Sequence, residues 1–500
     1  MPRKLLCTLL LCSSLGAANW WDHAVIYEIY PRSFADTNGD GIGDLIGITQ
    51  HLDYLKDLGV DAIWITPVCP SPQVDFGYDI SDYTAIDPQY GTMADFDRLV
   101  SEVGKRNISV IMDLVLNHTS DRHKWFEESR SSRTNPKADW YLWRDGKPNH
   151  QPPNNWRNPE VRKAMYDVVR FWIKKRVAGF RLDAVTSLFE EPALRDEPIK
   201  RPGLNAYDEP ILTRQYTDNL PEVHDVLREL RKVADESPGT VLIGETYIPN
   251  IRELARMYGA KNDGVQLPMD TLFGFVNKLS VTEFRTRIRE AETQLGGNPP
   301  RGAALLYYGE ELGMVNNDPK RKDVKDPIGK IGWPKEKGRD GERTPMQWTA
   351  GPQAGFSSAE VTWLPIAPNY KTRNVAVESK DSASLLNYYK ALLHLRKENA
   401  ALRDGEFQLA NDNSNVLSWL SKNRDGATAV VALNFTASPQ TVHFDAPAEA
   451  TRLLSSFSKA GDRTDLKNLT LPPYGAFVAQ VSRPVSAYIK IPYPRHTTNY

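Results

Sequence analysis

The stretch "SVIMDLVLNH" (109–118) shows the pattern from which the fold can be predicted. Its apolar residues do not alternate cleanly with polar ones, which is typical of a strand buried on both faces of a sheet. The stretch then ends in two polar residues, Asn117 and His118. We therefore expect a strand inside a parallel sheet, with polar groups where the strand leaves the core.

Six further apolar runs of this kind lie between residues 24 and 311. They are "AVIYEIYPRSF" (24–34), "DAIWITPV" (61–68), "AGFRLDAV" (178–185), "VLIGETY" (241–247), "GVQLPMD" (264–270) and "AALLYYGEE" (303–311). Between these runs the apolar spacing is helical, and we expect helices over 45–59, 159–176, 221–237 and 282–297. A last helix over 384–400 is expected to close the barrel. The alternation predicts an α/β fold, a (β/α)8 TIM barrel over residues 19–118 and 159–400. Because only seven strands can be counted, the barrel is expected to lack one βα unit.

Three other regions surround the predicted barrel. Residues 119–158 are polar and rich in Trp and Pro, which indicates a small, shortened subdomain inserted after the third strand. Residues 402–482 contain short strand patterns separated by turn signals, which predicts a C-terminal all-β sandwich. Residues 483–500 contain three prolines and are expected to form a loosely held tail.

The first eighteen residues have the pattern of a signal peptide. A positive start, "MPRK", precedes the short apolar run "LLCTLLLCSSL" and small residues that suit cleavage. The alternative is a buried N-terminal helix. The signal peptide predicts export to the periplasm or the extracellular space. Only Cys69 would remain after cleavage, so no intrachain disulfide is expected.

Charge and composition narrow the function. The formal net charge of the 500 residues is −1, without a basic surplus or polybasic run, so neither nucleic acid nor an anionic membrane is an expected partner. The apolar leader is too short to span a bilayer, so no membrane span is expected. The oligomeric state is not fixed by the sequence.

Polar residues at the ends of four predicted strands indicate a site. In such barrels the chemistry lies at the carboxyl ends of the strands. Asp183 and Glu245 follow different strands, so they can face each other as the two carboxyls that glycoside hydrolysis requires. Arg181 shares a strand face with Asp183 and can keep it ionised. The alternative is a structural role for all of these residues. The stretches are "GYDISDY" (77–83), "DLVLNH" (113–118), "GFRLDA" (179–184) and "GETY" (244–247).

The loop "DTNGDGIGD" (36–44) has the chemistry of a calcium site. Asp36, Asn38, Asp40 and Asp44 offer side-chain oxygens at alternating positions, and the carbonyl of Ile42 can add another ligand. Gly stands where an EF-hand has its bidentate Glu, so the loop is not an EF-hand. The alternative is a turn without metal. The expected Ca²⁺ would be structural.

Several of these motifs together resemble the α-amylase family, specifically its oligosaccharide-cleaving α-glucosidase branch. The four strand-end stretches and three longer ones carry the resemblance, in the order the family has them. The longer stretches are "WWDHAVIYEIYPRSFADTNGDGIGDL" (20–45), "RGAALLYYGEELGM" (301–314) and "GRDGERTPMQW" (338–348).

The resemblance implies a retaining enzyme that removes terminal α-linked glucose from short oligosaccharides. It makes Asp183 the nucleophile and Glu245 the acid and base. Asp79, His118 and Arg181 would hold the glucose, Tyr78 would stack on its ring, and Ala184 favours α-1,4 linkages. The same likeness supports the expectation of a Ca²⁺ in the first strand–helix loop.

Two junctions depart from the family pattern. The family has a third catalytic Asp in an Asn-His-Asp motif after its seventh strand, and "ETQLGGNPPRGAALLYYGEE" (292–311) leaves no room for that βα unit. A second gap is expected between Trp156 and Arg157. The missing contact predicts weak or absent activity. Two alternatives stay open: a non-catalytic sugar-binding or partner protein of this fold, and a glucosyl transferase such as a trehalose synthase.

Overall fold

The computed structural model describes residues 19–143, 154–248, 250–274, 276, 278–295, 302–444 and 449–482. The predicted signal peptide (1–18) and the predicted tail (483–500) lie outside these ranges, as do residues 144–153 of the predicted inserted subdomain and most of the junction at 298–302.

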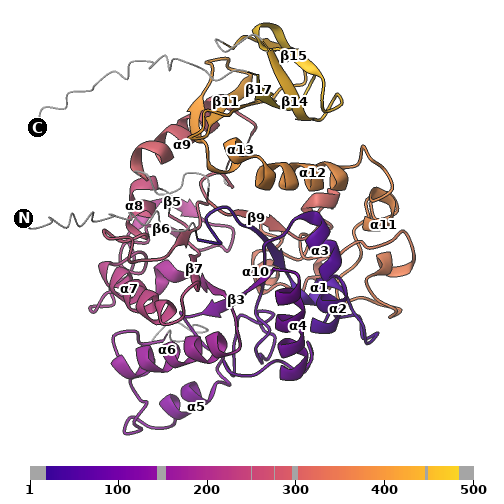
Figure 1. Ribbon diagram of the computed structural model, residues 1–500. Helices are drawn as coiled ribbons and strands as arrows, with labels where there is room; N and C mark the ends of the chain where they lie inside the picture. The colour runs from indigo at the N-terminus through magenta and orange to yellow at the C-terminus, as the bar shows by residue number, and fades with distance from the viewer. Residues whose placement is uncertain are drawn as a thin grey trace, which may run out of the picture.

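The centre of the molecule is a curled sheet of seven parallel strands surrounded by helices (Figure 1). Its spatial order is β8-β7-β4-β3-β2-β1-β9, so the first strand pairs with the last. Within the described residues, β8 and β9 are the two ends of this sheet. The strands are β1 (Val25–Ile29), β2 (Ala62–Ile65), β3 (Ser109–Val115), β4 (Gly179–Asp183), β7 (Val241–Gly244), β8 (Leu267–Pro268) and β9 (Ala304–Tyr307).

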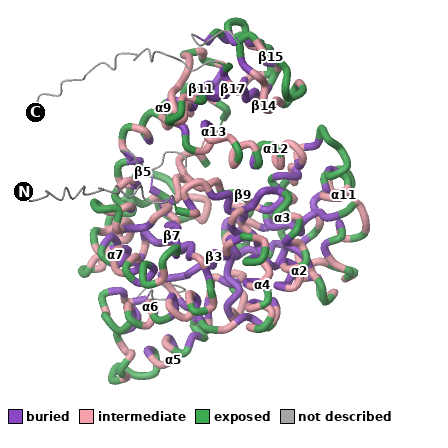
Figure 2. The backbone as a smooth tube through the Cα atoms, viewed as in Figure 1, coloured by how far each residue is buried: buried purple, intermediate pink, exposed green. Residues whose placement is uncertain are grey.

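Burial on both faces explains the strand patterns. In β3 every residue after Ser109 is buried, and β2, β4 and β7 are buried throughout (Figure 2). The seven predicted strands and the parallel sheet are confirmed. The strand predicted over 264–270 is much shorter, because Pro268 has no N–H to continue the hydrogen-bond ladder.

Most helices lie on the outside of the sheet. The prediction of one helix over 45–59 is wrong in one respect, because the backbone leaves helical geometry at His51 and divides it into α2 and α3. The helices are α1 (Pro31–Phe34), α2 (Leu45–Gln50), α3 (Leu52–Leu58), α4 (Met93–Lys105), α5 (Lys124–Ser131), α6 (Pro159–Lys174), α7 (Pro221–Asp235), α8 (Ile251–Arg256), α9 (Val281–Gln294), α10 (Pro327–Gly332), α11 (Val375–Glu378), α12 (Leu385–Glu398) and α13 (Ala400–Asp404). No described helix combines the length and apolar composition needed to cross a membrane.

Residues 77–83 correct one prediction. The expected strand end is absent there, because these residues lie in the loop between β2 and α4. Phe76 and Gly77 have positive φ angles of 45° and 106°, which an extended strand does not accommodate. Sequence patterns also missed an exposed hairpin after β4, formed by β5 (Ile199–Leu204) and β6 (Pro210–Leu212).

The C-terminal region is all-β, as predicted. A six-stranded sheet in the order β10-β11-β12-β17-β14-β15 and a two-stranded sheet, β13-β16, share one apolar core. This domain lies beyond α12 and α13 at one end of the molecule (Figure 1). Its strands are β10 (Glu406–Leu409), β11 (Val416–Lys422), β12 (Thr428–Asn434), β13 (Gln440–Val442), β14 (Glu449–Ser455), β15 (Arg463–Asp465), β16 (Leu469–Leu471) and β17 (Ala476–Val481).

Helix α9 joins the two domains through a buried arginine. Nη2 of Arg285 donates to the carbonyl oxygens of Asn413 at 3.0 Å and Val416 at 3.3 Å. These carbonyls lie within or just before the first long strand of the C-terminal sheet. Arg285 therefore ties the barrel to that sheet by hydrogen bonds shielded from water.

Replacing Arg285 by Met should destabilise the protein by about 1–3 kcal/mol, because two partly buried carbonyls lose their donor. Arg289 on the same helix makes only an exposed ion pair with Asp412, and Arg289→Met should cost no more than about 1 kcal/mol. Thermal unfolding of both variants tests this difference. Equal effects of the two substitutions would contradict the interdomain role of Arg285.

Candidate active site

The two predicted catalytic carboxyls lie together at the carboxyl ends of β4 and β7. Asp183 is the last residue of β4, and Glu245 directly follows β7. The register pairs Leu182 with Gly244, so the two residues leave the sheet at the same level. Asp183 is 8% exposed. The predicted juxtaposition across neighbouring strands is present.

Arg181 connects both carboxyls and a third one. Its guanidinium lies 2.7 Å from Asp183 Oδ1, 2.6 Å from Glu245 Oε1 and 2.8 Å from Asp113 Oδ1. Nη1 of Arg181 contacts Asp113 and Asp183, and Nη2 contacts Glu245. Both nitrogens are bonded to the same guanidinium carbon. The carboxyls of Asp183 and Glu245 therefore lie close together on one guanidinium.

A glycine allows β4 and β7 to approach closely enough for this contact. A Cβ on Gly179 would lie 2.4 Å from Cγ1 and 2.6 Å from the carbonyl oxygen of Val241, on the paired strand. Any other residue would separate the two strands that carry Asp183 and Glu245.

Asp113 is a member of the cluster that sequence reasoning did not single out. Its Oδ2 accepts hydrogen bonds from the hydroxyl of Tyr78 at 3.1 Å and from Nε1 of Trp64 at 3.3 Å. The guanidinium carbon of Arg181 lies 5.1 Å from the Trp64 ring centroid, in cation–π geometry. A charged residue inside the otherwise apolar β3 was the available sequence signal.

Burial controls the protonation of the cluster. It raises the pKa of Asp183 to about 8, helped by the charges of Asp113 and Glu245 and opposed by Arg181. Burial likewise raises the pKa of Asp113 and raises that of Glu28, on β1, to about 8. Arg181 opposes the rise for Asp183 but does not cancel it, so the expectation that Arg181 keeps Asp183 ionised does not hold near neutral pH.

The predicted sugar-holding residues divide into two groups. Tyr78 belongs to the cluster through Asp113, and Nε2 of His118 donates to the Tyr78 carbonyl at 3.1 Å. Burial lowers the pKa of His118, which favours its neutral form. Asp79 instead accepts hydrogen bonds from Ser71 Oγ at 2.6 Å and from backbone N–H groups of the 71–75 loop. The structure thus directs Asp79 toward that loop.

The backbone after β4 also contacts the acid–base candidate. Ala184 has a left-handed conformation, with φ 44°, and its N–H donates to Glu245 Oε2 at 2.8 Å. Together with Arg181, this contact fixes both oxygens of Glu245.

The predicted calcium loop is held by its own hydrogen bonds. Asp36 Oδ1 accepts from the N–H of Asn38 at 3.0 Å, Asn38 Oδ1 from that of Asp40 at 2.9 Å, and Asp40 Oδ1 from that of Ile42 at 2.8 Å. These oxygens are hard ligands of the kind Ca²⁺ prefers. They fit the predicted ion in chemistry and share one loop.

Asp44, the fifth predicted ligand, has a structural role as well. Its Oδ1 caps α2 by accepting from the N–H of Gly47 at 2.7 Å, and its Oδ2 accepts from Thr37. In the described parts of the chain, no three His, Cys, Asp or Glu side chains are arranged to hold a metal ion.

The sequence of the alpha amylase catalytic domain family matches residues 28–158, 151–294 and 298–405 of this chain. The chain belongs to the alpha-amylase family. The fold expected from the motif resemblance is therefore confirmed. The first two matched segments overlap at residues 151–158, and residues 295–297 lie between the second and the third.

Curated relatives cover almost the whole chain. A probable alpha-glucosidase of Rhizobium meliloti (strain 1021) is 36% identical over 543 residues, covering 93% of this chain and 97% of that protein. Maltase 1 of Drosophila virilis is 35% identical, covering 93% and 87%. An oligo-1,6-glucosidase of Parageobacillus thermoglucosidasius is 33% identical, covering 93% and 99%. These relatives are glycoside hydrolases by name.

Solved structures of similar proteins include an alpha-glucosyl transfer enzyme and an isomaltulose synthase. The alpha-glucosyl transfer enzyme XgtA superposes with a TM-score of 0.84 at 34% identity, covering 93% of this chain and all of that one. A mutant isomaltulose synthase of Erwinia rhapontici NX5, solved with sucrose, superposes with a TM-score of 0.83 at 29% identity, covering 94% and 100%.

The raised pKa of Asp183 predicts a stability that depends on pH. Between the ordinary carboxyl pKa of about 4 and the folded-state value of about 8, the folded chain keeps a proton that the unfolded chain releases. Stability should therefore fall as pH rises through this window. Because Asn cannot ionise, Asp183→Asn should stabilise the protein at pH 8 by about 1–2 kcal/mol and much less near pH 4.5.

Melting temperatures of both proteins at the two pH values measure this effect. Asp425→Asn, at an exposed position in the C-terminal domain, is the matched control and should differ from the parent by the same small amount at both pH values. A variant Asp183→Asn that is less stable than the parent at pH 8 would contradict the raised pKa.

Proposed function

We propose that this protein is a retaining α-glucosidase that removes terminal α-linked glucose from short oligosaccharides. The observation that carries the proposal is the pair Asp183 and Glu245 on one guanidinium at neighbouring strand ends. Retaining glycosidases need two carboxyls about 5–5.5 Å apart, and a shared arginine favours such a separation.

The proposed reaction has two displacements. In the first, the Asp183 carboxylate forms a bond to the anomeric carbon while the glycosidic bond breaks, and Glu245 gives its proton to the leaving oxygen. In the second, Glu245 takes a proton from water as the water oxygen attacks the anomeric carbon and the bond to Asp183 breaks. Glucose leaves with net retention, and both carboxyls return to their first states.

Arg181 has a positioning role in this scheme. It contacts nucleophile and acid–base together, while Asp113 and the Trp64 ring hold its guanidinium from the other side. Because the pKa of Asp183 is about 8, the ionised nucleophile becomes more abundant as the pH rises toward that value. Ionisation of the nucleophile should accordingly contribute a rise in the kcat/KM of the free enzyme at pH values above the ordinary carboxyl range.

We propose that the enzyme cleaves α-1,4 linkages, because the resemblance to the family associates Ala184, directly after the nucleophile, with this linkage. Relatives of both linkage types match this chain, the maltase of Drosophila virilis and the oligo-1,6-glucosidase of Parageobacillus thermoglucosidasius among them. Hydrolysis rates on maltose and isomaltose distinguish the two specificities.

Glucosyl transfer is a second candidate function, and the similarity to XgtA and to an isomaltulose synthase favours it. A sugar hydroxyl would replace water in the second displacement, with the same carboxyls in the same roles. Chromatography of products formed from maltose and from sucrose separates free glucose from new disaccharides.

We also propose that the chain lacks the family's seventh βα unit and its third catalytic Asp. Two findings support this: the family match is interrupted between residues 294 and 298, and the 543-residue alignment with the Rhizobium meliloti relative is longer than the whole chain. The loss of one transition-state contact typically reduces the rate by about 10²–10³-fold. We therefore expect slow turnover.

Trapping the covalent intermediate tests the roles directly and tolerates slow turnover. With α-glucosyl fluoride, whose leaving group needs no acid, Glu245→Gln should form the Asp183 ester and hydrolyse it slowly. Intact-mass spectrometry should then show one added glucosyl unit, and peptide mapping should locate it on Asp183. Asp183→Asn is the matched control and should show no addition.

The same experiment decides between catalysis and simple sugar binding. If neither the parent nor Glu245→Gln gains mass or releases glucose while glucose still binds, the protein is a non-catalytic sugar-binding member of the fold. An ester on any carboxyl other than Asp183 would refute the assigned nucleophile.

We propose in addition that the loop at 36–44 binds Ca²⁺ through Asp36, Asn38, Asp40 and Ile42, with Asp44 closing the set. A chelator should then lower the melting temperature, and added Ca²⁺ should restore it, because an ion bound only by the folded chain stabilises it. Asp40→Asn should weaken the response. An identical melting temperature with chelator and with millimolar Ca²⁺ would rule out the site.

A further inference from the structure

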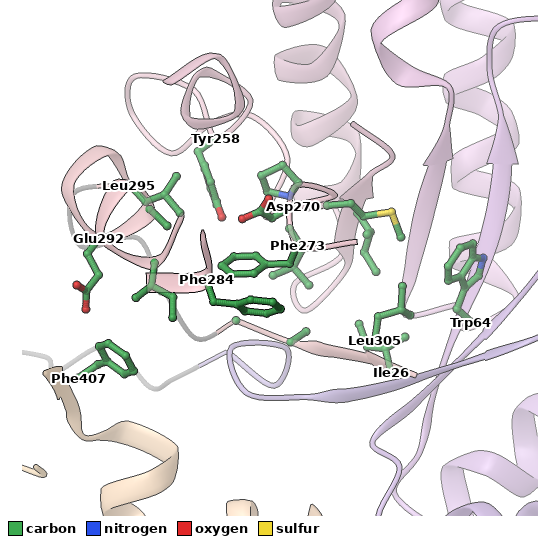
Figure 3. A pocket seen from close by; sticks show the side chains of 18 residues that line it. Ile26, Trp64, Tyr258, Asp270, Phe273, Phe284, Glu292, Leu295, Leu305 and Phe407 are labelled. Atoms are coloured by element: carbon green, nitrogen blue, oxygen red, sulfur yellow. The ribbon is translucent and has the colours of Figure 1, made fainter. Parts of the chain in front are cut away.

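An apolar cavity of about 570 Å³ lies between the two end strands of the parallel sheet (Figure 3). Leu267 and Pro268 of β8 line one side, and Ala303 and Leu305, at and in β9, line the other. Helix α9 contributes Phe284 and neighbouring residues, and Trp64 closes the inner wall. The cavity thus lies between the interior of the barrel and α9.

The strand edges at this cavity are unpaired within the described residues. β9 bonds β1 through alternate residues, since the N–H groups of Ala304 and Tyr308 donate to Ala24 and Glu28. The N–H of Leu305 therefore faces the opposite edge. Leu305 is also 43% exposed in a sheet whose central strands are buried. An apolar wall beside open backbone edges suits an added β-strand better than a compact ligand.

The described part of the C-terminal domain ends close to this cavity. Through β11 and β12, Phe407, which lines the cavity, lies in the same register row as Gln480 of β17. Three strand spacings separate them, roughly 14 Å. The described chain stops two residues later, at Ser482.

Hydrogen bonds made by the end of α12 indicate from which side a segment after Ser482 would approach the cavity. Nδ2 of Asn399 donates to Gln480 Oε1 at 3.0 Å, and Arg396, one turn earlier on α12, donates to the carbonyl of Gly302 at 3.0 Å. Gly302 lies two residues before Ala304, the first residue of β9. Asn399 and Arg396 therefore link the end of β17 to the residues just before β9, on the side from which a segment after Ser482 would approach. A segment that enters there would run parallel to β8 and β9.

The remaining sequence has the required pattern. "VSAYIKI" (485–491) places Val485, Ala487, Ile489 and Ile491 on one face of a strand and polar or amphipathic residues on the other. Pro492 then ends the pattern. We propose that residues 485–491 insert between β8 and β9 as an eighth parallel strand, with their apolar face in the cavity. The inserted strand would support the inner wall at Trp64, whose Nε1 donates to Asp113.

Cysteine cross-linking in the full-length chain tests this placement. Leu305→Cys is combined in turn with a cysteine at each position from 485 to 491, and the oxidised proteins are analysed by peptide mapping. We expect disulfides from the apolar-face positions, such as Ala487→Cys and Ile489→Cys, at several-fold higher yield than from Tyr488→Cys or Lys490→Cys. They should occur in the monomer. Equal yields at all positions, or disulfides found only in dimers, would overturn the proposal, and the latter would assign the cavity to a second copy.

Truncation gives an independent measurement. A chain ending at Ser482 should bind more of a hydrophobic dye such as ANS and melt several degrees lower than the full chain. A synthetic peptide of residues 483–500 should reverse both changes, whereas the same peptide with Ile489→Asp and Ile491→Asp should not. Unchanged dye binding and melting temperature on truncation would refute the insertion.

Discussion

The site depends on one buried cation, the guanidinium of Arg181, shared by three carboxyls. Asp113, Asp183 and Glu245 come from three adjacent strands, and each lies within 2.8 Å of it. Without the cation, three carboxyls in so little space would repel one another and could not all be buried. With it, the three carboxyls can lie side by side, although burial still raises the pKa values of Asp113 and Asp183.

This arrangement makes the sheet itself part of the chemistry. Arg181 and Asp183 are two residues apart on β4, so the pleat puts both on one face. The register sets Asp113 opposite Arg181, and Glu245 just beyond β7. The Trp64 ring packs against the guanidinium of Arg181 and also lines the apolar cavity. The carboxyl cluster and the open part of the barrel wall therefore share one side chain.

Features that arise from burial could be predicted from the sequence, whereas features that depend on local backbone geometry could not. Runs such as 109–118 identify buried strands because burial on both faces removes polar alternation. The Asp183–Glu245 pair follows from barrel topology, because the carboxyl ends of neighbouring strands lie together. The direction of Asp79 is different, because it depends on hydrogen bonds with the 71–75 loop. Residues 77–83 likewise resemble a strand end in sequence although they form a loop. The positive φ at Phe76 could not be predicted, because no residue pattern marks it. Asp113 was visible, as a charge in an apolar strand.

The close contact at Gly179 has a consequence for protein engineering. With no room for a Cβ against Val241, this position accepts no other side chain while the neighbouring strands stay paired. Libraries that aim to alter substrate choice should leave it untouched and vary the loops beyond the strand ends, where backbone spacing is not already at its limit. The tight packing at Gly179 would then restrict useful variation to these loops.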